Sequence, residues 1–404
     1  MKIVMICEFY NETLEFQENL LVKYYRKHGH EVTVITSTFE SVFDYYNDRY
    51  DRTRPGRTYL DHGATIVKLP YRYNLLNRLR AYTPIDDLLR QAQPDLIFVH
   101  DIMPNLPEAL AYLRSHPECR MILDYHADYS NSGKNWLSLR ILHGVMRKWF
   151  LSRARPHLQR IFPVVPASAV FLHEVYGVDH AEMEILPLGA DMDLVRRIRS
   201  EGRRTDLRHA LGIKDDDLVI FTGGKLTSNR RTEILLDALE LLSRLPLKVI
   251  VVGDCGDDAR DYRDFLHEKA RGRDNVTFTG WLGKEDVYRH MHLADIAVFP
   301  ASQSIMWQQA IASGLPLIVG DVGSQDISYL NLRDNIVILP RDEIRADRLA
   351  EAIAVVLETP GRLQSMARGA AQVADENLDW DRLIERTLRF NRQSSEQGPR
   401  STVN

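Results

Sequence analysis

Short runs rich in Val, Ile and Leu recur along the whole chain, and helix-length stretches lie between them. Nearly continuous apolar strands that alternate with helices are typical of parallel sheets covered on both faces. The runs form two series, one in each half of the chain, which predicts an α/β protein of two doubly wound domains. The first series is KIVMICEF, EVTVITS, ATIVKLP, DLIFVHD, RMILDYH and RIFPVVP, and the second is LVIFTGG, LKVIVVGD, NVTFTG, DIAVFPA, LPLIVGD and NIVILPR.

The segment EILPLGADMDLV is the predicted domain boundary, because a strand ends there in Pro-Leu-Gly and a charged stretch follows. We therefore expect a first domain at residues 1–188 and a second at 189–375. The polar tail, residues 393–404, is expected to be disordered. Ligands of open α/β sheets bind beyond the carboxyl ends of the strands, so the site is expected in a cleft between the domains. Further helices are expected at Ile344–Leu357, Gly361–Ala374 and Trp380–Asn391.

Length and charge exclude several classes of protein. A chain of 404 residues suits two domains of ordinary size, and a formal net charge of −4 gives no support for nucleic-acid binding. Cys7, Cys119 and Cys255 lack metal-ligand spacing, which favours buried thiols in a reducing compartment. The N-terminal apolar run is too short for a signal peptide, and no segment approaches the length of a membrane span. The sequence predicts a cytoplasmic protein.

The loop FTGGKLTSNRR is the strongest candidate for a binding site. Gly223 and Gly224 end a strand, Lys225 follows, and Arg230 and Arg231 open a helix. Backbone amides of a glycine turn and a helix start, together with cations, form an anion site that suits a diphosphate. The alternative is a solvated basic helix start, but cations there oppose the helix dipole unless an anion is bound.

Two further strand ends carry polar clusters. His126 follows the strand LDY beside Asp124, and it is either a ligand-binding side chain or a histidine bonded to backbone. His100 and Asp101 form a weaker pair of the same kind. The acidic turn after VIVVG is predicted to cap the next helix rather than to bind a metal, since clustered Asp at a helix start is usually capping. Its residues are Asp254, Asp257 and Asp258.

The stretch RILHGVMRKWFLSRARPHLQRIF mixes large apolar residues with Arg and Lys. Such a basic amphipathic segment can lie on an anionic membrane face. The alternative is a surface helix packed on the sheet with its cations extended into water. We favour the surface helix and keep membrane contact as the second interpretation.

Several motifs, read in order, resemble the retaining nucleotide-sugar glycosyltransferases of the GT-B fold, in the family called group 1 or family 4. The resemblance covers nearly the whole chain. It implies two Rossmann-like domains that face a cleft, with a C-terminal helix at residues 376–392 crossing back onto the first domain. The motifs are KHGHEVTVIT, VVPASAVFLHEVYGVDHAEMEILPLGADMD, FTGGKL…NRR, VIVVGDCGDD, NVTFTGWLGKEDVYRHMHLADIAVFPAS, QAIASGLPLIVGDVGS and NLDWDRLIERTL.

The resemblance also implies roles for individual residues. Lys225 and Arg230 would bind the donor diphosphate, beside Gly223 and Gly224, and His126 would lie near the transferred sugar. Gln309 replaces the family's Glu that holds the ribose hydroxyls, and the first Glu of the E-x7-E loop is also missing. The remaining expected donor contacts are Trp281 and Leu282 at the nucleotide base, and Gln303 and Ser304 at sugar hydroxyls and phosphate.

The implied reaction moves a hexose from a nucleotide-diphosphate sugar to a hydroxyl of a saccharide or lipid-linked saccharide, with retention. Fixed cations stabilise the leaving diphosphate, so neither a metal nor a further cofactor is expected. Bacterial surface polysaccharide or glycolipid synthesis, at or near the inner membrane face, is the implied setting. The alternatives are a degenerate protein of this fold that binds or regulates a partner, and a nucleotide-sugar epimerase.

Overall fold

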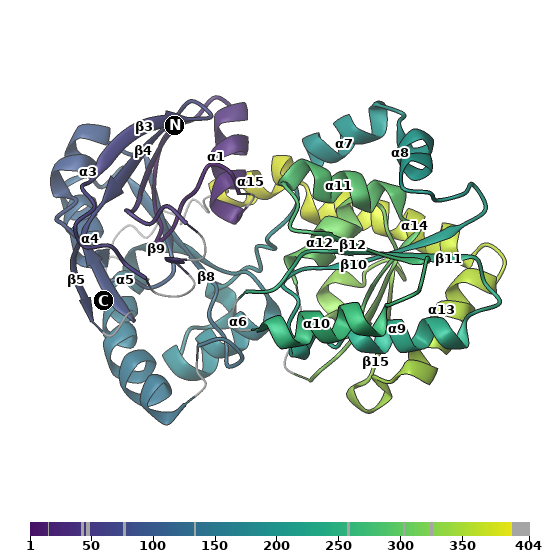
Figure 1. Ribbon diagram of the computed structural model, residues 1–404. Helices are drawn as coiled ribbons and strands as arrows, with labels where there is room; N and C mark the ends of the chain where they lie inside the picture. The colour runs from purple at the N-terminus through teal and green to yellow at the C-terminus, as the bar shows by residue number, and fades with distance from the viewer. Residues whose placement is uncertain are drawn as a thin grey trace, which may run out of the picture.

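The computed structural model describes residues 1–14, 16–41, 44–45, 49–75, 78–132, 135–256, 259–301, 304–323 and 326–389. They form two α/β domains side by side, the first mainly in purple and blue and the second in teal, green and yellow (Figure 1). Among these residues, no helix combines the length and the apolar character needed to cross a bilayer.

The first domain is built on a seven-stranded sheet in the order β3-β4-β2-β1-β7-β8-β9. Its six parallel strands are the six apolar runs of the first half of the sequence. The antiparallel edge strand β3 and a separate β5–β6 hairpin were not expected. Strands β3 and β5 are largely exposed, and β6 is buried but only four residues long. The strands are β1 (Lys2–Ile6), β2 (Glu31–Ser37), β3 (Arg57–Asp61), β4 (Ala64–Leu69), β5 (Tyr71–Leu75), β6 (Leu79–Tyr82), β7 (Leu96–His100), β8 (Arg120–Tyr125) and β9 (Leu158–Pro163).

Helices and two buried clusters cover both faces of this sheet. One long helical stretch runs from the π-helix η1 directly into α5. The helices are α1 (Gln17–Lys27), α3 (Asp86–Ala92), α4 (Leu106–Ser115), η1 (Ser138–Arg147), α5 (Lys148–Ala154), η2 (Arg155–His157), α6 (Pro166–Phe171), η3 (Leu172–Tyr176) and η4 (His180–Glu182).

The second domain has a six-stranded, fully parallel sheet in the order β12-β11-β10-β13-β14-β15. Its strands coincide with the six apolar runs of the second half, and two buried clusters lie on its two faces. The strands are β10 (Leu218–Gly223), β11 (Leu247–Val252), β12 (Val276–Gly280), β13 (Ile296–Phe299), β14 (Leu317–Gly320) and β15 (Ile336–Leu339). The helices are α7 (Met192–Ser200), α8 (Arg204–Ala210), η5 (Ser228–Arg230), α9 (Thr232–Leu241), α10 (Arg260–Lys269), α11 (Lys284–Leu293), α12 (Ile305–Ala312), η7 (Ser328–Leu330), η8 (Arg341–Glu343), α13 (Ala346–Glu358), α14 (Arg362–Val373), η9 (Ala374–Leu378) and α15 (Trp380–Leu388).

The C-terminal helix α15 returns to the first domain, where it lies beside α1 (Figure 1). Trp380, Leu383 and Ile384 are buried in the cluster that also contains residues of α1 and β1. The Tyr25 hydroxyl lies 2.5 Å from Thr387 Oγ1, and Lys27 Nζ lies 2.7 Å from an Asp381 carboxylate oxygen. The predicted fold class, two doubly wound parallel sheets with a helix that crosses back, is confirmed.

The connection between the domains passes through Gly189. Leu186 lies in a core cluster of the first domain and Ala190 in one of the second. Gly189 has φ +65°, and an added Cβ would lie 2.5 Å from Trp380 Nε1 and 2.8 Å from Leu383. A glycine is therefore required both by the left-handed backbone and by the close approach of α15.

Candidate functional site

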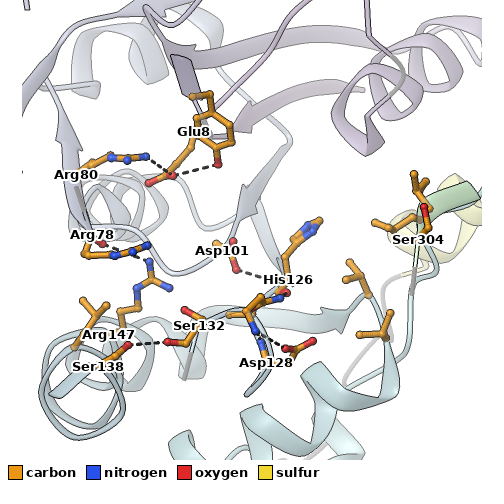
Figure 2. A pocket seen from close by; sticks show the side chains of 18 of the residues that line it. Glu8, Arg78, Arg80, Asp101, His126, Asp128, Ser132, Ser138, Arg147 and Ser304 are labelled. Carbon is orange, nitrogen blue, oxygen red and sulfur yellow. Dashed lines mark hydrogen bonds and ion pairs between the residues drawn. The ribbon is translucent and has the colours of Figure 1, made fainter. Parts of the chain in front are cut away.

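A cavity of about 740 Å³ opens between the two domains. Strand ends of the first sheet supply one side: Glu8 follows β1, Asp101 follows β7 and His126 follows β8. The second domain contributes Ser304, which lies on the opposite side of the cavity (Figure 2). The position matches the rule that ligands of open α/β sheets bind beyond the carboxyl ends of the strands.

His126 belongs to a cluster centred on one buried carboxylate. Asp124 Oδ2 lies 3.2 Å from Nε2 of His126 and 3.0 Å from Nδ1 of His100. Burial opposes ionisation of Asp124, yet the two histidines hold the pKa of its carboxyl well below its usual range. Burial disfavours the His126 imidazolium, but the Asp124 carboxylate outweighs this and raises the pKa of His126 to about 10. The His126 side chain, 31% exposed, therefore presents a positive charge to the cavity.

The His126 backbone is fixed separately from its ring. Its N–H donates to Asp101 Oδ1 at 3.1 Å, a contact drawn in Figure 2. Asp101 itself has φ +61°, in the left-handed region that Asp tolerates better than most residues. The ring of His126 is thus paired with the Asp124 carboxylate and borders the cavity. Among the described hydrogen bonds, none joins this ring to a backbone group.

His100, Asp124 and His126 are the one group among the described residues whose ligand atoms are close enough to hold a metal ion, all within 4.8 Å. A histidine must offer a neutral nitrogen to a metal. Asp124 also raises the pKa of His100, against the effect of burial. A protonated His126 beside the Asp124 carboxylate fits an ion-pair cluster better than a metal site.

The glycine turn after β10 is tightly packed. An added Cβ on Gly223 would lie 2.3 Å from the carbonyl oxygen of Val252. Gly224 has φ +118°, and its N–H donates to the same carbonyl at 2.9 Å. An added Cβ on Gly224 would lie 3.6 Å from Ser304 Oγ, so this turn adjoins the start of α12. The two glycines are required by close backbone packing at a site where the two loops meet.

Lys225 and Arg230 lie together, but not in the cavity lined by His126. They border a second hollow of about 580 Å³, with Tyr262 and Asp261 of α10. Lys225 is exposed and Arg230 half-buried. Burial lowers the pKa of the Arg230 guanidinium from its usual value. Lys225 and Arg230 thus line one hollow, and their role as diphosphate ligands stays a prediction. The backbone of Gly224, in the same loop, lies near Ser304, which borders the cavity.

The other expected donor contacts are spread over the second domain. Trp281 is 52% exposed after β12, and Leu282 packs on the core. Ser304 caps α12, its Oγ accepting from the Met306 N–H at 3.3 Å, and it borders the cavity. Gln309 is buried on α12, and Gln303 lies outside the described residues.

One expectation at an acidic turn is wrong. Asp254 was expected to cap the helix that follows it, but its carboxylate accepts from the N–H of Cys255 at 2.7 Å instead. Helix α10 begins at Arg260, and no side chain of its N-cap residue Ala259 caps it. Asp254 is too far back in the chain to reach that helix start, while Asp257 and Asp258 lie outside the described residues.

Several cavity residues were missed from sequence. Gln308, next to the expected Gln309, is the amide that borders the cavity; its Oε1 accepts from the Gly189 N–H at 2.7 Å. Arg78, Arg80 and Arg147 border the cavity on the side of the first domain (Figure 2). Arg78 and Arg80 lie in the β5–β6 hairpin, which was not expected from the sequence. Arg147 was expected in a surface helix. No sequence motif therefore indicated that these arginines border a cavity.

The η1–α5 stretch has two different faces. Ser138, Leu142 and Arg147 border the cavity, and His143 is buried. Other positions, mostly four residues apart, expose large apolar side chains that a helix packed on the sheet would bury. This exposed stripe consists of Trp136 (70% exposed), Leu137 (58%), Ile141 (45%), Val145 (62%) and Trp149 (46%).

Two family models match this chain. The model of Glycosyltransferase Family 4 matches residues 19–194, and the model of Glycosyl transferases group 1 matches residues 216–359. The two matches fall on the first and second domain, respectively.

Curated relatives include a D-inositol 3-phosphate glycosyltransferase of Rhodococcus erythropolis, 29% identical over 238 residues, which are 56% of this chain and 52% of the relative. A GDP-mannose-dependent alpha-(1-6)-phosphatidylinositol monomannoside mannosyltransferase of Mycobacterium tuberculosis is 25% identical over 221 residues, 52% of this chain and 56% of the relative. The chain thus spans about half the length of the curated relatives it matches.

Solved structures share the fold over nearly the whole chain. Anabaena HepE in complex with UDP and glucose has a TM-score of 0.66 at 18% identity, covering 96% of this chain and 99% of its own. A sucrose-phosphate synthase from Thermosynechococcus elongatus has a TM-score of 0.65 at 15% identity, covering 95% of this chain and 96% of its own.

Proposed function

Because this chain belongs to the family 4 (group 1) glycosyltransferases of the GT-B fold, we propose that it transfers a hexose from a nucleotide-diphosphate sugar to a hydroxyl acceptor. The observation that carries the proposal is a cavity between the two domains together with a hollow at the cationic loop of the second domain. The cavity borders His126 and Ser304, and the hollow lies beside Lys225 and Arg230. The acceptor would occupy the first, and the donor would extend from the second toward it.

Lys225 and Arg230 would stabilise the departing nucleoside diphosphate. Negative charge develops on this leaving group in the transition state, and fixed cations in a site that excludes water stabilise it without reorganisation. The lowered pKa of Arg230 reflects a guanidinium partly withdrawn from water, a setting in which a bound anion gains more from it. Neither a metal ion nor another cofactor is then needed for leaving-group departure.

We propose that the transfer retains the anomeric configuration, as the resemblance to the retaining enzymes of this family implies. A double displacement needs a carboxylate that is able to attack the anomeric carbon. The acids bordering the cavity are all engaged: Glu8 with Arg80 at 3.1 Å, Asp101 with the His126 N–H, and Asp128 with a tight turn at Ser130. We propose that the acceptor attacks from the side of the leaving group, whose phosphate takes the proton, while His126 donates to a sugar hydroxyl.

Gln309 stands where a carboxylate would hold the ribose, and this favours a second candidate. A protein of this fold that had lost catalysis would bind a partner or nucleotide without turnover. A nucleotide-sugar epimerase would instead release nucleotide without needing an acceptor. An assay of nucleotide release with and without acceptor separates these alternatives, because only transfer requires both substrates.

We also propose that the protein acts at the cytoplasmic face of a membrane, on a glycolipid or a lipid-linked saccharide. The exposed stripe lies in a segment, residues 129–173, that contains seven Lys or Arg and no Asp or Glu, in a chain whose formal charge is −4. Apolar side chains flanked by cations match an anionic lipid surface. The mycobacterial relative is named for a phosphatidylinositol monomannoside, an acceptor that a membrane holds.

The decisive assay of the activity is turnover with uridine, guanosine and thymidine diphosphate sugars against lipid-linked and soluble acceptors. Nucleoside diphosphate release that depends on an acceptor supports a transferase. Absence of both binding and turnover with every nucleotide sugar contradicts it.

A further inference from the structure

We infer that Arg78 and Arg147 form a subsite for a phosphate group carried by the acceptor. The inference rests on the proposed function, because it names the chemistry of the molecule that enters the cavity. Both side chains border the 740 Å³ cavity on the side away from Ser304 (Figure 2). A nucleotide sugar that approaches from the second domain would leave this end of the cavity to the acceptor.

Carboxylates of the cavity are already committed to other partners. Glu8 Oε2 accepts from Arg80 Nη1 at 3.1 Å and from the Tyr45 hydroxyl at 3.4 Å. Asp101 Oδ1 accepts from the His126 N–H at 3.1 Å. Asp128 Oδ1 accepts from the Ser130 N–H and hydroxyl at 2.7 and 2.6 Å. None of these three acids pairs with Arg78 or Arg147 within 4.0 Å.

Arg78 and Arg147 are close together. Arg147 Nη2 donates to the carbonyl oxygen of Arg78 at 3.5 Å, which brings the two side chains to the same wall. Arg147 Nε is buried and has no hydrogen-bond partner among the described residues. In the part of the chain that the structure describes, neither guanidinium has a carboxylate within salt-bridge distance. Burial opposes the charge of the Arg147 guanidinium, but Asp101 and, more weakly, Glu8 act from a distance to raise its pKa, so the group stays charged. A phosphate between Arg78 and Arg147 would supply the direct anionic partner that neither guanidinium has.

Neutral polar groups complete this end of the cavity. Ser132, Ser138, Asn131 and Asn135 border it with hydroxyl and amide groups. The Ser138 hydroxyl donates to the Ser132 carbonyl at 2.8 Å, and the Ser132 hydroxyl lies 3.0 Å from His143 Nε2. These bonds hold Ser132 against the helical stretch, on the cavity side that Arg147 also borders.

A phosphate ester is the anion that this arrangement fits. Guanidinium groups bind phosphate oxygens through paired N–H donors, and surrounding hydroxyl and amide groups satisfy the remaining oxygens. The phosphate can come from a membrane lipid or from a soluble sugar phosphate. The η1–α5 stretch supplies Arg147 on its cavity face and Val145 and Trp149 on its exposed face, so a lipid phosphate could reach the site from a membrane beside the helix.

The test measures the affinity of inorganic phosphate by titration calorimetry, in chloride buffer and with UDP at saturation so that Lys225 and Arg230 are occupied. The wild type is compared with Arg78→Gln, Arg147→Gln and the control Arg114→Gln, which removes an exposed cation of α4 in the same domain. We expect each of the first two changes to weaken phosphate binding about tenfold or more, the loss typical of one charge-assisted hydrogen bond. The control should bind as the wild type does.

Competition measurements identify the source of the phosphate, and a conservative variant replaces Arg147→Gln if that variant does not fold. Glucose 6-phosphate and dihexanoylphosphatidylglycerol compete with inorganic phosphate at this subsite, and the stronger competitor names a soluble or a lipid source. Arg147→Lys keeps a positive charge and, if Arg147→Gln fails to fold, should retain partial affinity. Equal phosphate affinity in wild type and both Gln variants, no phosphate binding, or equal binding of acetate overturns the inference. If UDP does not bind, the proposed function fails, while the phosphate titration is still decisive for this subsite.

Discussion

Asp124 Oδ2 lies 3.2 Å from Nε2 of His126, at the end of the strand that borders the cavity. The carboxylate is fully buried, whereas the imidazole is partly exposed, so the pair places a positive charge at the cavity surface. Such a cation can donate to a sugar hydroxyl or an anionic oxygen but cannot act as a base. We therefore predict a binding role for His126 rather than a proton-accepting one.

Replacement of Asp124 by Asn should therefore lower the pKa of His126 clearly below its wild-type value of about 10. Burial alone disfavours the imidazolium, and the carboxylate is the main group that raises its pKa to about 10. The signal of the His126 ring in proton NMR, followed against pH, measures the shift. If His126 titrates near pH 10 in both proteins, the proposed electrostatic control by Asp124 is wrong.

The same pair makes folding stability depend on alkaline pH. A histidine whose pKa is higher in the folded than in the unfolded chain stabilises the fold fully below its unfolded value, near 6.5, and loses this contribution as pH rises through 10. The free energy of unfolding by urea should fall between pH 7 and 10 more steeply in the wild type than in His126→Gln. Parallel curves for the two proteins would contradict the shifted pKa.

Lys225→Ala and Arg230→Ala should each reduce turnover at least about 100-fold, the loss typical of removing a group that stabilises transition-state charge. Arg244→Ala is the control, because Arg244 is an exposed cation paired with Glu358 outside both hollows. Steady-state release of nucleoside diphosphate measures the effect. Near-normal rates in the first two variants would show that neither cation stabilises the leaving group.

Gly189→Ala should destabilise the fold through α15. Its Cβ would lie 2.5 Å from Trp380 Nε1 and also meets a positive φ, whereas Gly202 has φ +63° with nothing within 4 Å. Gly202→Ala therefore isolates the backbone cost, about 1–2 kcal/mol for a left-handed residue. Urea unfolding should show a clearly larger loss for Gly189→Ala, by about 1–3 kcal/mol more for overpacking. Equal losses of unfolding free energy in the two variants would mean that α15 moves to accommodate the added methyl group without a further loss of stability.

Ile141→Ser combined with Val145→Ser should weaken binding to vesicles of phosphatidylglycerol and phosphatidylcholine at least about tenfold. Each buried methylene contributes about 0.8 kcal/mol to insertion at a membrane surface, and both changes remove several. Val355→Ser, which alters a residue 50% exposed in the second domain, is the matched control. Sedimentation with vesicles measures the bound fraction. Binding that is unaffected by the double change would assign the exposed stripe no role at a membrane.

The strands could be predicted almost completely from the sequence, because burial on both faces leaves continuous apolar runs such as that of β7. The hairpin β5–β6 could not, since its strands are only five and four residues long and mix Tyr and Leu with Arg and Asn in no clear period. For the same reason Arg78 was not predicted as a cavity residue, because no local sequence pattern indicates which exposed arginine borders a cavity.

The glycine turn and its cations could be found from sequence because their chemistry is local, in consecutive residues from Gly223 to Arg230. The choice between Gln308 and Gln309 could not, because one step along α12 turns the side chain by a large angle. The partnership of His100 and His126 depends on two strands being neighbours in the sheet, and Asp124 connects them only in the folded chain.

We propose above all that a hexose passes from a donor to an acceptor in the cavity between the two domains. The most direct measurement incubates the protein with nucleotide sugars and a lipid-linked or soluble phosphate-bearing acceptor, and follows nucleoside diphosphate release together with the anomeric configuration of the product by NMR. We predict release that requires the acceptor, a product with the anomeric configuration of the donor, and loss of both in Lys225→Ala. Release without acceptor, an inverted product, or no consumption of any nucleotide sugar would contradict the account.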